Sequence, residues 1–186
     1  MSFLSLITQR QSVRKYSPRQ VEPEKLTRCL EAARLAPSAS NTQPWHYIVV
    51  DQEPLRTEVA KATFSDLVKF NRFALQAPVI VVVLLEKPRL LNRFAMLLKN
   101  KEWRLIDIGI TAGHFCLQAT EEGLGTCMMG WFDENRLKEL LSVPATKTVG
   151  LVITVGYADD GYPLRKKIRK PVEEMVSYNG FGSGKQ

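Results

Sequence analysis

Basic and hydroxyl side chains alternate in a short stretch near the N-terminus. Arg10, Ser12 and Arg14 are each separated by one residue. In an extended segment alternate side chains point to one face, so two guanidinium groups and a hydroxyl would converge on the same object. A guanidinium group matches phosphate oxygens or a carbonyl edge in two-point fashion. The spacing therefore predicts an anion-binding segment, although a solvated basic strand fits the same residues.

A second basic stretch lies near the C-terminus. Five of the seven residues from 165 to 171 are lysine or arginine, and alternation would place Lys167 and Arg169 on one face. A nucleic-acid-binding or localisation tail is the alternative interpretation. No aromatic residues are interleaved with the charges, and the acidic pair Glu173 and Glu174 follows at once, which favours a small anionic ligand instead.

Small and polar residues framed by two prolines fill positions 37–44, between a helical pattern and a strand pattern. Pro37 stops the helix, and Pro44 biases the residue before it towards extended geometry. Small residues allow a flat ligand to approach the backbone, and Ser38, Asn41 and Gln43 offer donors and acceptors at its edge. A plain helix-to-strand loop is the alternative.

Glycines cluster at positions 123, 125 and 130 without matching a nucleotide-binding motif. A dinucleotide fingerprint would need glycine at Met128 and a preceding strand, and a P-loop would need lysine at Trp131. We expect a strand over 126–128 that leads to a turn at Met129 and Gly130.

These four segments, in the order in which they follow one another along the chain, resemble the FMN-dependent nitroreductase family. The family has an Arg-Arg-Ser-x-Arg-like string near its N-terminus, which residues 10–14 match except for Gln11 at the second position. The resemblance implies that Arg10, Gln11 and Ser12 hold the phosphate and ribityl side of FMN. It also implies that Arg14 faces the pyrimidine edge, where a cation stabilises the negative charge of the reduced ring. Lys167 and Arg169 would close over the phosphate.

The same resemblance assigns the remaining contacts to two subunits. The loop residues of one subunit would lie against the flavin that the other holds. They are Pro37, Ser38, Ala39 and Asn41. The backbone of Met128, Met129 and Gly130 would face flavin N5 and O4, and Asn71 would supply an amide to the pyrimidine edge. Trp131 stands where many relatives have a second glycine, so an indole would narrow the pocket or add a stacking surface.

Length and composition are those of an ordinary globular chain. The 186 residues are 45% hydrophobic and 24% charged, with a net charge of +7 that favours anionic ligands. We expect a single domain over 1–186, with 171–186 as a loose or partner-embracing end. No apolar run is long enough for a membrane helix, no secretory signal is evident, and three widely spaced cysteines suggest neither disulfides nor a metal site. A cytoplasmic protein that binds neither membrane nor nucleic acid is expected.

Periodicity predicts an α+β chain. We expect helices over 3–9, 23–36, 55–62, 64–76, 106–122 and 133–141, and strands over 45–50, 78–85, 126–128 and 148–157. A further helix is expected over 88–101. The resemblance implies that this region helps to roof the substrate pocket, with Phe94, Met96 and Trp103 as candidates, although a packing role fits them equally well. The resemblance implies the nitroreductase fold, a mainly antiparallel central sheet flanked by helices, in an intertwined homodimer with two FMN sites.

The function that the resemblance implies is hydride transfer from NADH or NADPH, through flavin N5, to a small-molecule electron acceptor in ping-pong order. Nitroaromatics and quinones are the expected acceptors, and no side chain is required for the chemical step itself. A reductive dehalogenase or a flavin-fragmenting enzyme of the same fold remains an alternative. So do a basic nucleic-acid-binding protein and a flavin-holding module without turnover.

Overall fold

A four-stranded antiparallel sheet forms the centre of the computed structural model, which describes residues 2–86 and 102–182. The strands are β1 (Trp45–Val50), β2 (Val79–Leu85), β3 (Gly125–Met129) and β4 (Thr148–Gly156), in the spatial order β1-β2-β4-β3. Every residue of β2 is buried, as the continuous β-branched run predicts for a central strand covered on both faces. The chain is therefore α+β, as expected.

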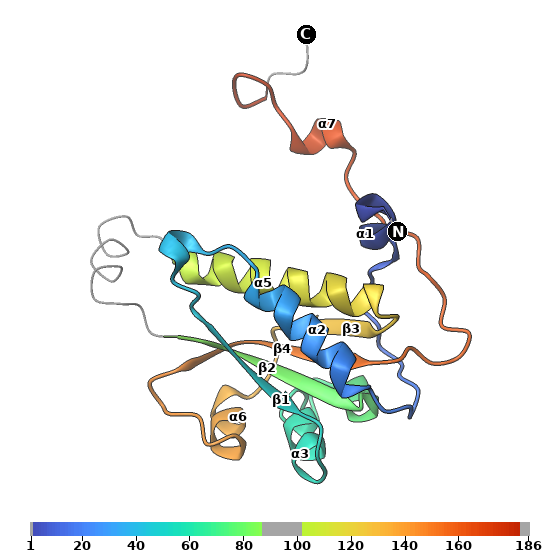
Figure 1. Cartoon of the computed structure of the whole chain (residues 1–186), viewed down its shortest axis with the longest axis vertical. Helices are drawn as coiled ribbons and strands as arrows, with labels where there is room; N and C mark the ends of the chain where they lie inside the picture. The colour runs from blue at the N-terminus through green and yellow to red at the C-terminus, as the bar shows by residue number, and fades with distance from the viewer. Residues whose placement is uncertain (1, 87–101, 183–186) are drawn as a thin grey trace.

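Helices cover both faces of the sheet (Figure 1). One face packs against α2 (Pro23–Arg34) and α5 (Trp103–Glu121), and the other against α3 (Leu55–Lys61) and α6 (Glu134–Leu140). Pro23 occupies the first turn of α2, and Asp133 caps α6 by accepting a hydrogen bond from the Arg136 amide at 2.9 Å. Both helix starts were predicted from these residues.

The long helix α5 leaves part of its surface uncovered. Its buried side includes Ile108, Ala112 and Phe115, whereas Leu105 and Ile106 are 54% and 60% exposed. The sequence predicted one apolar face beginning at Ile106, and this face is not the one that packs on the sheet. The helix also begins at Trp103, three residues before the predicted start.

A segment near each end of the chain lies beside β3. The N-terminal helix α1 (Phe3–Gln9) leads to residue 12, which pairs with Thr126 of β3 through a parallel bridge. After β4 the chain runs back along this segment and then projects from the body through α7 (Val172–Met175) (Figure 1). This arm exposes three large apolar side chains to solvent, Ile168, Met175 and Phe181.

The predicted helix over 64–76 is wrong for its first two thirds. Only η2 (Arg72–Gln76), a 3-10 helix, forms there. The Ser65 amide donates to the Val68 carbonyl at 3.0 Å and the Val68 amide to the Ser65 hydroxyl at 3.1 Å, so local bonds replace the helical ones.

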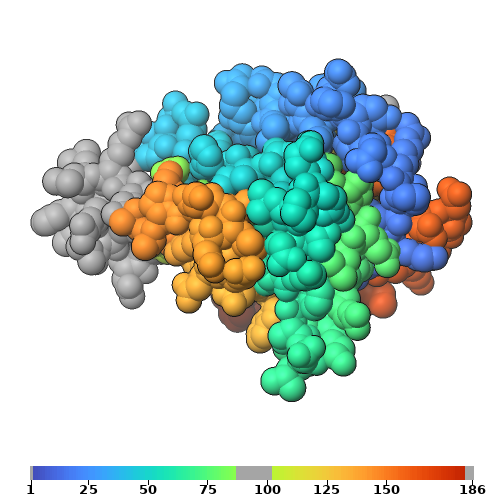
Figure 2. Space-filling model, turned by 90° about the horizontal axis from the view of Figure 1, so that it is seen from below, coloured from blue at the N-terminus to red at the C-terminus, as the bar shows by residue number. Residues whose placement is uncertain are grey.

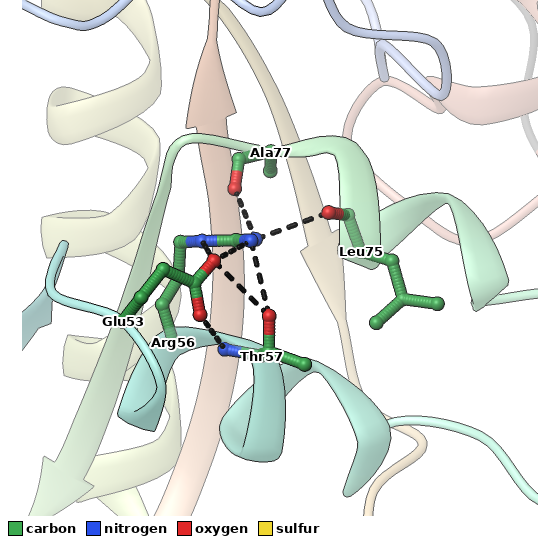
Figure 3. Close-up of polar contacts among 5 residues, drawn as sticks. All are labelled: Glu53, Arg56, Thr57, Leu75 and Ala77. Carbon is green, nitrogen blue, oxygen red and sulfur yellow. Dashed lines mark hydrogen bonds and ion pairs between the residues drawn. The ribbon is translucent and has the colours of Figure 1, made fainter.

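Arg56 fixes the chain between α3 and β2 (Figure 3). Its guanidinium donates to the carbonyls of Leu75 at 3.1 Å and Ala77 at 2.8 Å, and it also pairs with Glu53. These bonds hold η2 against α3. Another short element is η1 (Ala39–Asn41). The predicted helix over 88–101, with Phe94 and Met96, lies outside the described residues.

No described helix is long and apolar enough to cross a membrane.

Candidate functional site

Residues 10–14 and 165–169 face each other across a cavity of about 280 Å³, which we call the cationic cleft. It brings together six of the predicted FMN-binding residues. They are Arg10, Gln11, Ser12, Arg14, Lys167 and Arg169. Alternation predicted that Arg10, Ser12 and Arg14 share a face, but Gln11 and all of residues 165–169 also line the cleft, and neither segment is a strand in the structure.

The cleft is built on the edge of β3. The Val13 amide donates to the Thr126 carbonyl at 2.9 Å, which anchors the N-terminal wall. The Gln11 side chain joins the walls, because its amide nitrogen donates to Pro163 at 3.0 Å and its oxygen accepts from the Arg165 amide at 3.1 Å. Lys167 donates to the Arg10 carbonyl at 2.6 Å. Gln11, which departs from the family's usual arginine, is thus a structural bridge.

Arg165 is a member of the cleft that the sequence analysis missed. Its guanidinium donates to the Ser12 carbonyl and lies against Gln11. The signal was present, since Arg165, Lys167 and Arg169 alternate, but only the last two matched the family pattern.

The positive charge in the cleft is not neutralised by the chain. Among residues 2–86 and 102–182, no ion pair with a carboxylate forms at Arg10, Arg14, Arg165, Lys167 or Arg169. The pKa of Lys167 is lowered by its partial burial and then by Arg169, Arg10 and Arg165. Cations that disfavour one another in a shared cleft form a site for an anion.

Arg14 occupies the end of the cleft that lies against β3. Its backbone amide donates to the Tyr162 hydroxyl at 3.1 Å, and its guanidinium lines the cleft. Burial raises the pKa of the Cys127 thiol of β3, and Arg14 is the main group opposing that shift. The charge of Arg14 therefore lies close enough to β3 to act on Cys127, the residue before Met128 and Met129.

The turn after β3 leaves room for a ligand. Gly130 is exposed, and a Cβ atom built on it would meet nothing within 4 Å. Asn71 is 5% exposed and donates from its amide nitrogen to the carbonyls of Thr63 at 3.1 Å and Trp131 at 3.2 Å. In this structure the Asn71 amide group supports the turn after β3. Arg56 fixes the segment that follows Asn71 (Figure 3).

Trp131 projects beyond the turn and meets an aromatic partner. Its ring lies edge-on to Phe70, with centroids 6.2 Å apart and planes at 62°. The side chains are 55% and 64% exposed, which is unusual for two large rings in contact. Phe70 was not singled out from the sequence.

The loop over 37–44 is held in a strained conformation. Ser40, Asn41 and Gln43 have φ values of 51°, 50° and 46°, a left-handed region that costs residues other than glycine about 1–3 kcal/mol each. The Gln43 amide donates to the Ser38 hydroxyl at 2.9 Å, and the Ala39 amide donates to the Asp107 carboxylate at 3.2 Å. These bonds offset part of the strain.

The predicted loop residues do not join the cationic cleft within one chain. Pro37, Ser38, Ala39 and Asn41 are absent from its lining. The loop lies beside the N-terminal end of α5, while the cleft lies towards the other end of that helix (Figure 1). The structure thus places the predicted contacts in two groups at separate places.

Comparison with known proteins decides the family. The model of the Nitroreductase family matches residues 7–157, which cover the N-terminal wall of the cleft, the loop and the turn after β3.

The chain belongs to the nitroreductase family.

Its similarity to individual nitroreductases extends over most of the chain. A putative NADH dehydrogenase/NAD(P)H nitroreductase of Archaeoglobus fulgidus is 33% identical over 162 residues, which are 84% of this chain and 86% of that protein. The crystal structure of an FMN-dependent nitroreductase from Clostridium difficile R20291 is 27% identical and superposes with a TM-score of 0.74, covering 96% of this chain and 100% of the other. The nitroreductase fold predicted from the sequence is confirmed.

One similar protein is named for deiodination and not for nitro reduction. An iodotyrosine deiodinase from Thermotoga neapolitana is 28% identical over 190 residues, which are 95% of this chain and 97% of that protein.

Proposed function

We propose that this nitroreductase is a single-domain, FMN-dependent NAD(P)H oxidoreductase that reduces electron-poor acceptors such as nitroaromatics or quinones. The observation on which the proposal depends is the cationic cleft, where the six lysines and arginines of the lining, Lys166 included, lack carboxylate partners in the described chain. An FMN phosphate would supply the missing negative charge. The open turn at Gly130, after β3, would leave space for the ring.

The residues of this chain bind and orient, and none is required to act as acid or base. FMN, when bound, supplies the hydride-accepting and hydride-donating centre at its N5 atom. Arg10, Ser12, Lys167 and Arg169 donate to its phosphate. Arg14 places a positive charge at the pyrimidine edge, where negative charge is stabilised. The missing side chain of Gly130 allows the backbone to approach the ring.

A second copy of the chain completes the site. Gly109 and Gly113 each weaken the middle of α5 by about 1 kcal/mol relative to alanine, yet a Cβ at either position meets nothing within 4 Å. The exposed Leu105 and Ile106 flank them. Small residues with apolar neighbours on an uncovered helix face suit a close helix approach, so we infer a homodimer through α5. That pairing would bring the loop over 37–44 of one copy to the cleft of the other.

The dimer is tested by adding bulk to this face. Gly109→Leu should shift the molar mass in light scattering from dimer to monomer, whereas Asn135→Leu, an exposed position on α6 across the sheet, should not. A dimer that survives Gly109→Leu unchanged would contradict the assignment of the interface to α5.

Purification followed by spectroscopy tests the enzymatic proposal. The protein should be yellow, release FMN on acid treatment, lose its flavin absorbance on addition of NADH or NADPH under anaerobic conditions, and regain it with 4-nitrobenzoate or a quinone. A colourless protein that takes up no FMN would overturn the proposal. Flavin that binds but is never bleached would leave a holding module, and salt-dependent DNA binding by a colourless chain would favour the nucleic-acid-binding alternative.

Reductive dehalogenation is a second candidate, favoured by the likeness to the Thermotoga neapolitana deiodinase. Iodide release from 3-iodotyrosine by the reduced protein would support it. Turnover of nitroaromatics without iodide release would leave the first proposal alone.

A further inference from the structure

A second cavity, of about 380 Å³, opens between α3 and α6 next to the glycine turn. The two helices lie side by side on the face shown in Figure 2, where they are coloured teal and orange. Trp131, the residue after Gly130, forms one wall, so the cavity begins where a ligand on the turn would end. We call it the α3–α6 cavity. It lies within the size range of small-molecule sites.

The lining combines ring faces with charges of both signs. Phe64, Trp131 and Phe132 supply the rings, and Lys61 and Arg136 supply the cations. Phe64 and Phe132 are half-buried, and Trp131 is 55% exposed. Nucleobases stack favourably on aromatic rings, which makes such walls suited to an adenine.

The two cations can turn to a ligand at small cost. Lys61 pairs with Glu58 at 2.7 Å, and one guanidinium nitrogen of Arg136 is 3.6 Å from the same carboxylate. Exposed pairs of this kind contribute little to stability, so exchanging the carboxylate for a diphosphate loses little. Arg136 also reaches Glu139 at 2.9 Å, a contact that is compatible with a phosphate on its other edge.

Carboxylates in the cavity set a limit on the ligand's charge. Glu58 is held ionised, because the hydrogen bond from Lys61 lowers its pKa, and Asp133 lies beside it in the lining. A carboxylate accepts hydrogen bonds from ribose hydroxyls, as in dinucleotide sites, but repels a phosphate at the same place. The cavity therefore matches an adenosine diphosphate group with a free 2′-hydroxyl.

We propose that the α3–α6 cavity binds the adenosine diphosphate half of NADH and makes NADH the preferred hydride donor over NADPH. The inference rests on the proposed function, since it assumes that the nicotinamide half reaches the turn at Gly130. The adenine stacks on Phe64 and Trp131. The diphosphate replaces the Glu58 carboxylate as the partner of Lys61 and Arg136. The Glu58 carboxylate then accepts hydrogen bonds from the adenosine ribose.

Calorimetric titration of the FMN-loaded protein with ADP tests the site without turnover. ADP should bind, and 2′,5′-ADP should bind at least tenfold more weakly. Phe64→Ala and Arg136→Gln should each weaken ADP binding fivefold or more. Arg34→Gln removes a similar exposed ion pair, with Glu31 on α2 across the sheet, and should change nothing. Absence of ADP binding, or equal binding in the Phe64→Ala and Arg136→Gln variants, would overturn the proposal.

The rate of flavin bleaching with three donors separates this proposal from the preceding one. NADH should bleach the protein at least tenfold more efficiently than NADPH or reduced nicotinamide mononucleotide, which lacks the adenosine half. Glu58→Gln should reduce the discrimination against NADPH by about tenfold. Equal efficiency of all three donors refutes the cavity assignment and leaves the oxidoreductase intact. If no donor bleaches the flavin, the proposed function fails, and the ADP titration still decides whether the cavity is a nucleotide site.

Discussion

Two groups of cationic side chains differ in whether carboxylates of the described chain pair with them. In the first, which we call the paired cluster, every cation has a partner. Arg28 forms two bonds with Glu122, at 2.7 and 2.8 Å, and Arg19 reaches Glu22 at 2.7 Å while lying 3.9 Å from the Tyr157 ring centroid. In the cationic cleft Arg165 and Lys167 donate to backbone carbonyls, and the neighbouring arginines lower the pKa of Lys167.

The difference separates structural charge from functional charge. The paired cluster links α2, the end of α5 and the segment after β4, and Lys25 adds bonds to the Glu122 carbonyl at 2.7 Å and the Tyr157 hydroxyl at 2.9 Å. Those groups are satisfied within the chain. The cleft has the same kinds of side chain without the acids, so its charges are arranged for a ligand. Variants in the two regions should consequently affect different observables.

Removing one cleft charge should have the largest effect on the cofactor. Lys167→Met should weaken FMN binding by about 10- to 100-fold, because a charge-assisted bond to phosphate is lost. The melting temperature of the FMN-free protein should stay unchanged or rise, since the neighbours of Lys167 already disfavour its charge. Fluorescence titration and thermal denaturation measure the two quantities. A lower melting temperature with unchanged FMN affinity would reverse the assignment.

Asp107 is the acidic counterpart of the cleft, a charged group that lacks a full set of partners. It is 4% exposed, one carboxylate oxygen accepts from Ala39, and the other has no hydrogen-bond partner among residues 2–86 and 102–182. Asp107→Leu should release the loop over 37–44 and weaken FMN binding about tenfold, without lowering the melting temperature of the FMN-free protein, because an unpartnered buried carboxylate is unfavourable.

Asp107→Asn is the matched control for that prediction. Its amide oxygen still accepts from Ala39, so FMN binding should stay within about threefold of the parent. Equal losses in the two Asp107 variants would show that the charge, and not the bond to the loop, is what matters.

Breaking the paired cluster should affect stability alone. Arg28→Met should lower the melting temperature by about 2–4 °C and leave the FMN dissociation constant unchanged, because Glu122 loses its two-point partner and neither residue lines the cleft. Measuring both quantities on this variant and on Lys167→Met completes the comparison. Loss of FMN in Arg28→Met would mean that the two regions are not independent.

Lowering the pH should reduce the stabilisation that the paired cluster provides. Hydrogen bonds from Tyr157 to Glu22, and from Arg28 to Glu122, lower the pKa of each carboxyl to about 2. Since the unfolded value is near 4.3, the stabilisation is complete above about pH 4.5 and is lost as the pH falls towards 2. The melting-temperature difference between the parent and Glu122→Gln should therefore be constant from pH 7 to 5 and shrink below pH 4. A difference that persists at pH 2 would contradict this.

Local patterns predicted most of the fold. Strands β1, β2 and β4 agree with the apolar runs at their positions within one residue at each end, because buried strands need such runs. Cys29 and Cys116 are buried as packing residues, at 0% and 1% exposure. The segment over 64–71 was missed because Asn71 and the Ser65 hydroxyl form local bonds that compete with a helix, and periodicity does not register them.

The candidate site, like the fold, was predictable from the sequence only in part. The clustering of charge in residues 10–14 and 165–169 is a local property, and it predicted which segments line the cleft. Alternation within each segment did not select the lining side chains, because Gln11 and all of residues 165–169 contribute. The α3–α6 cavity was not predictable, because Glu58 and Arg136 are brought together only by the packing of α3 on α6. The contact of Phe70 with Trp131 likewise depends on the irregular path of the chain after α3. The roles of the individual site residues remain proposals.

A crystal structure of the protein with FMN tests the account most directly. We predict a dimer in which the phosphate lies within hydrogen-bond distance of Ser12, Lys167 and Arg169 of one copy, with the ring directed to Gly130 of that copy and covered by residues 38–41 of the other. A flavin that contacts the cationic cleft and the loop of the same copy, or that lies outside the cleft altogether, would contradict it.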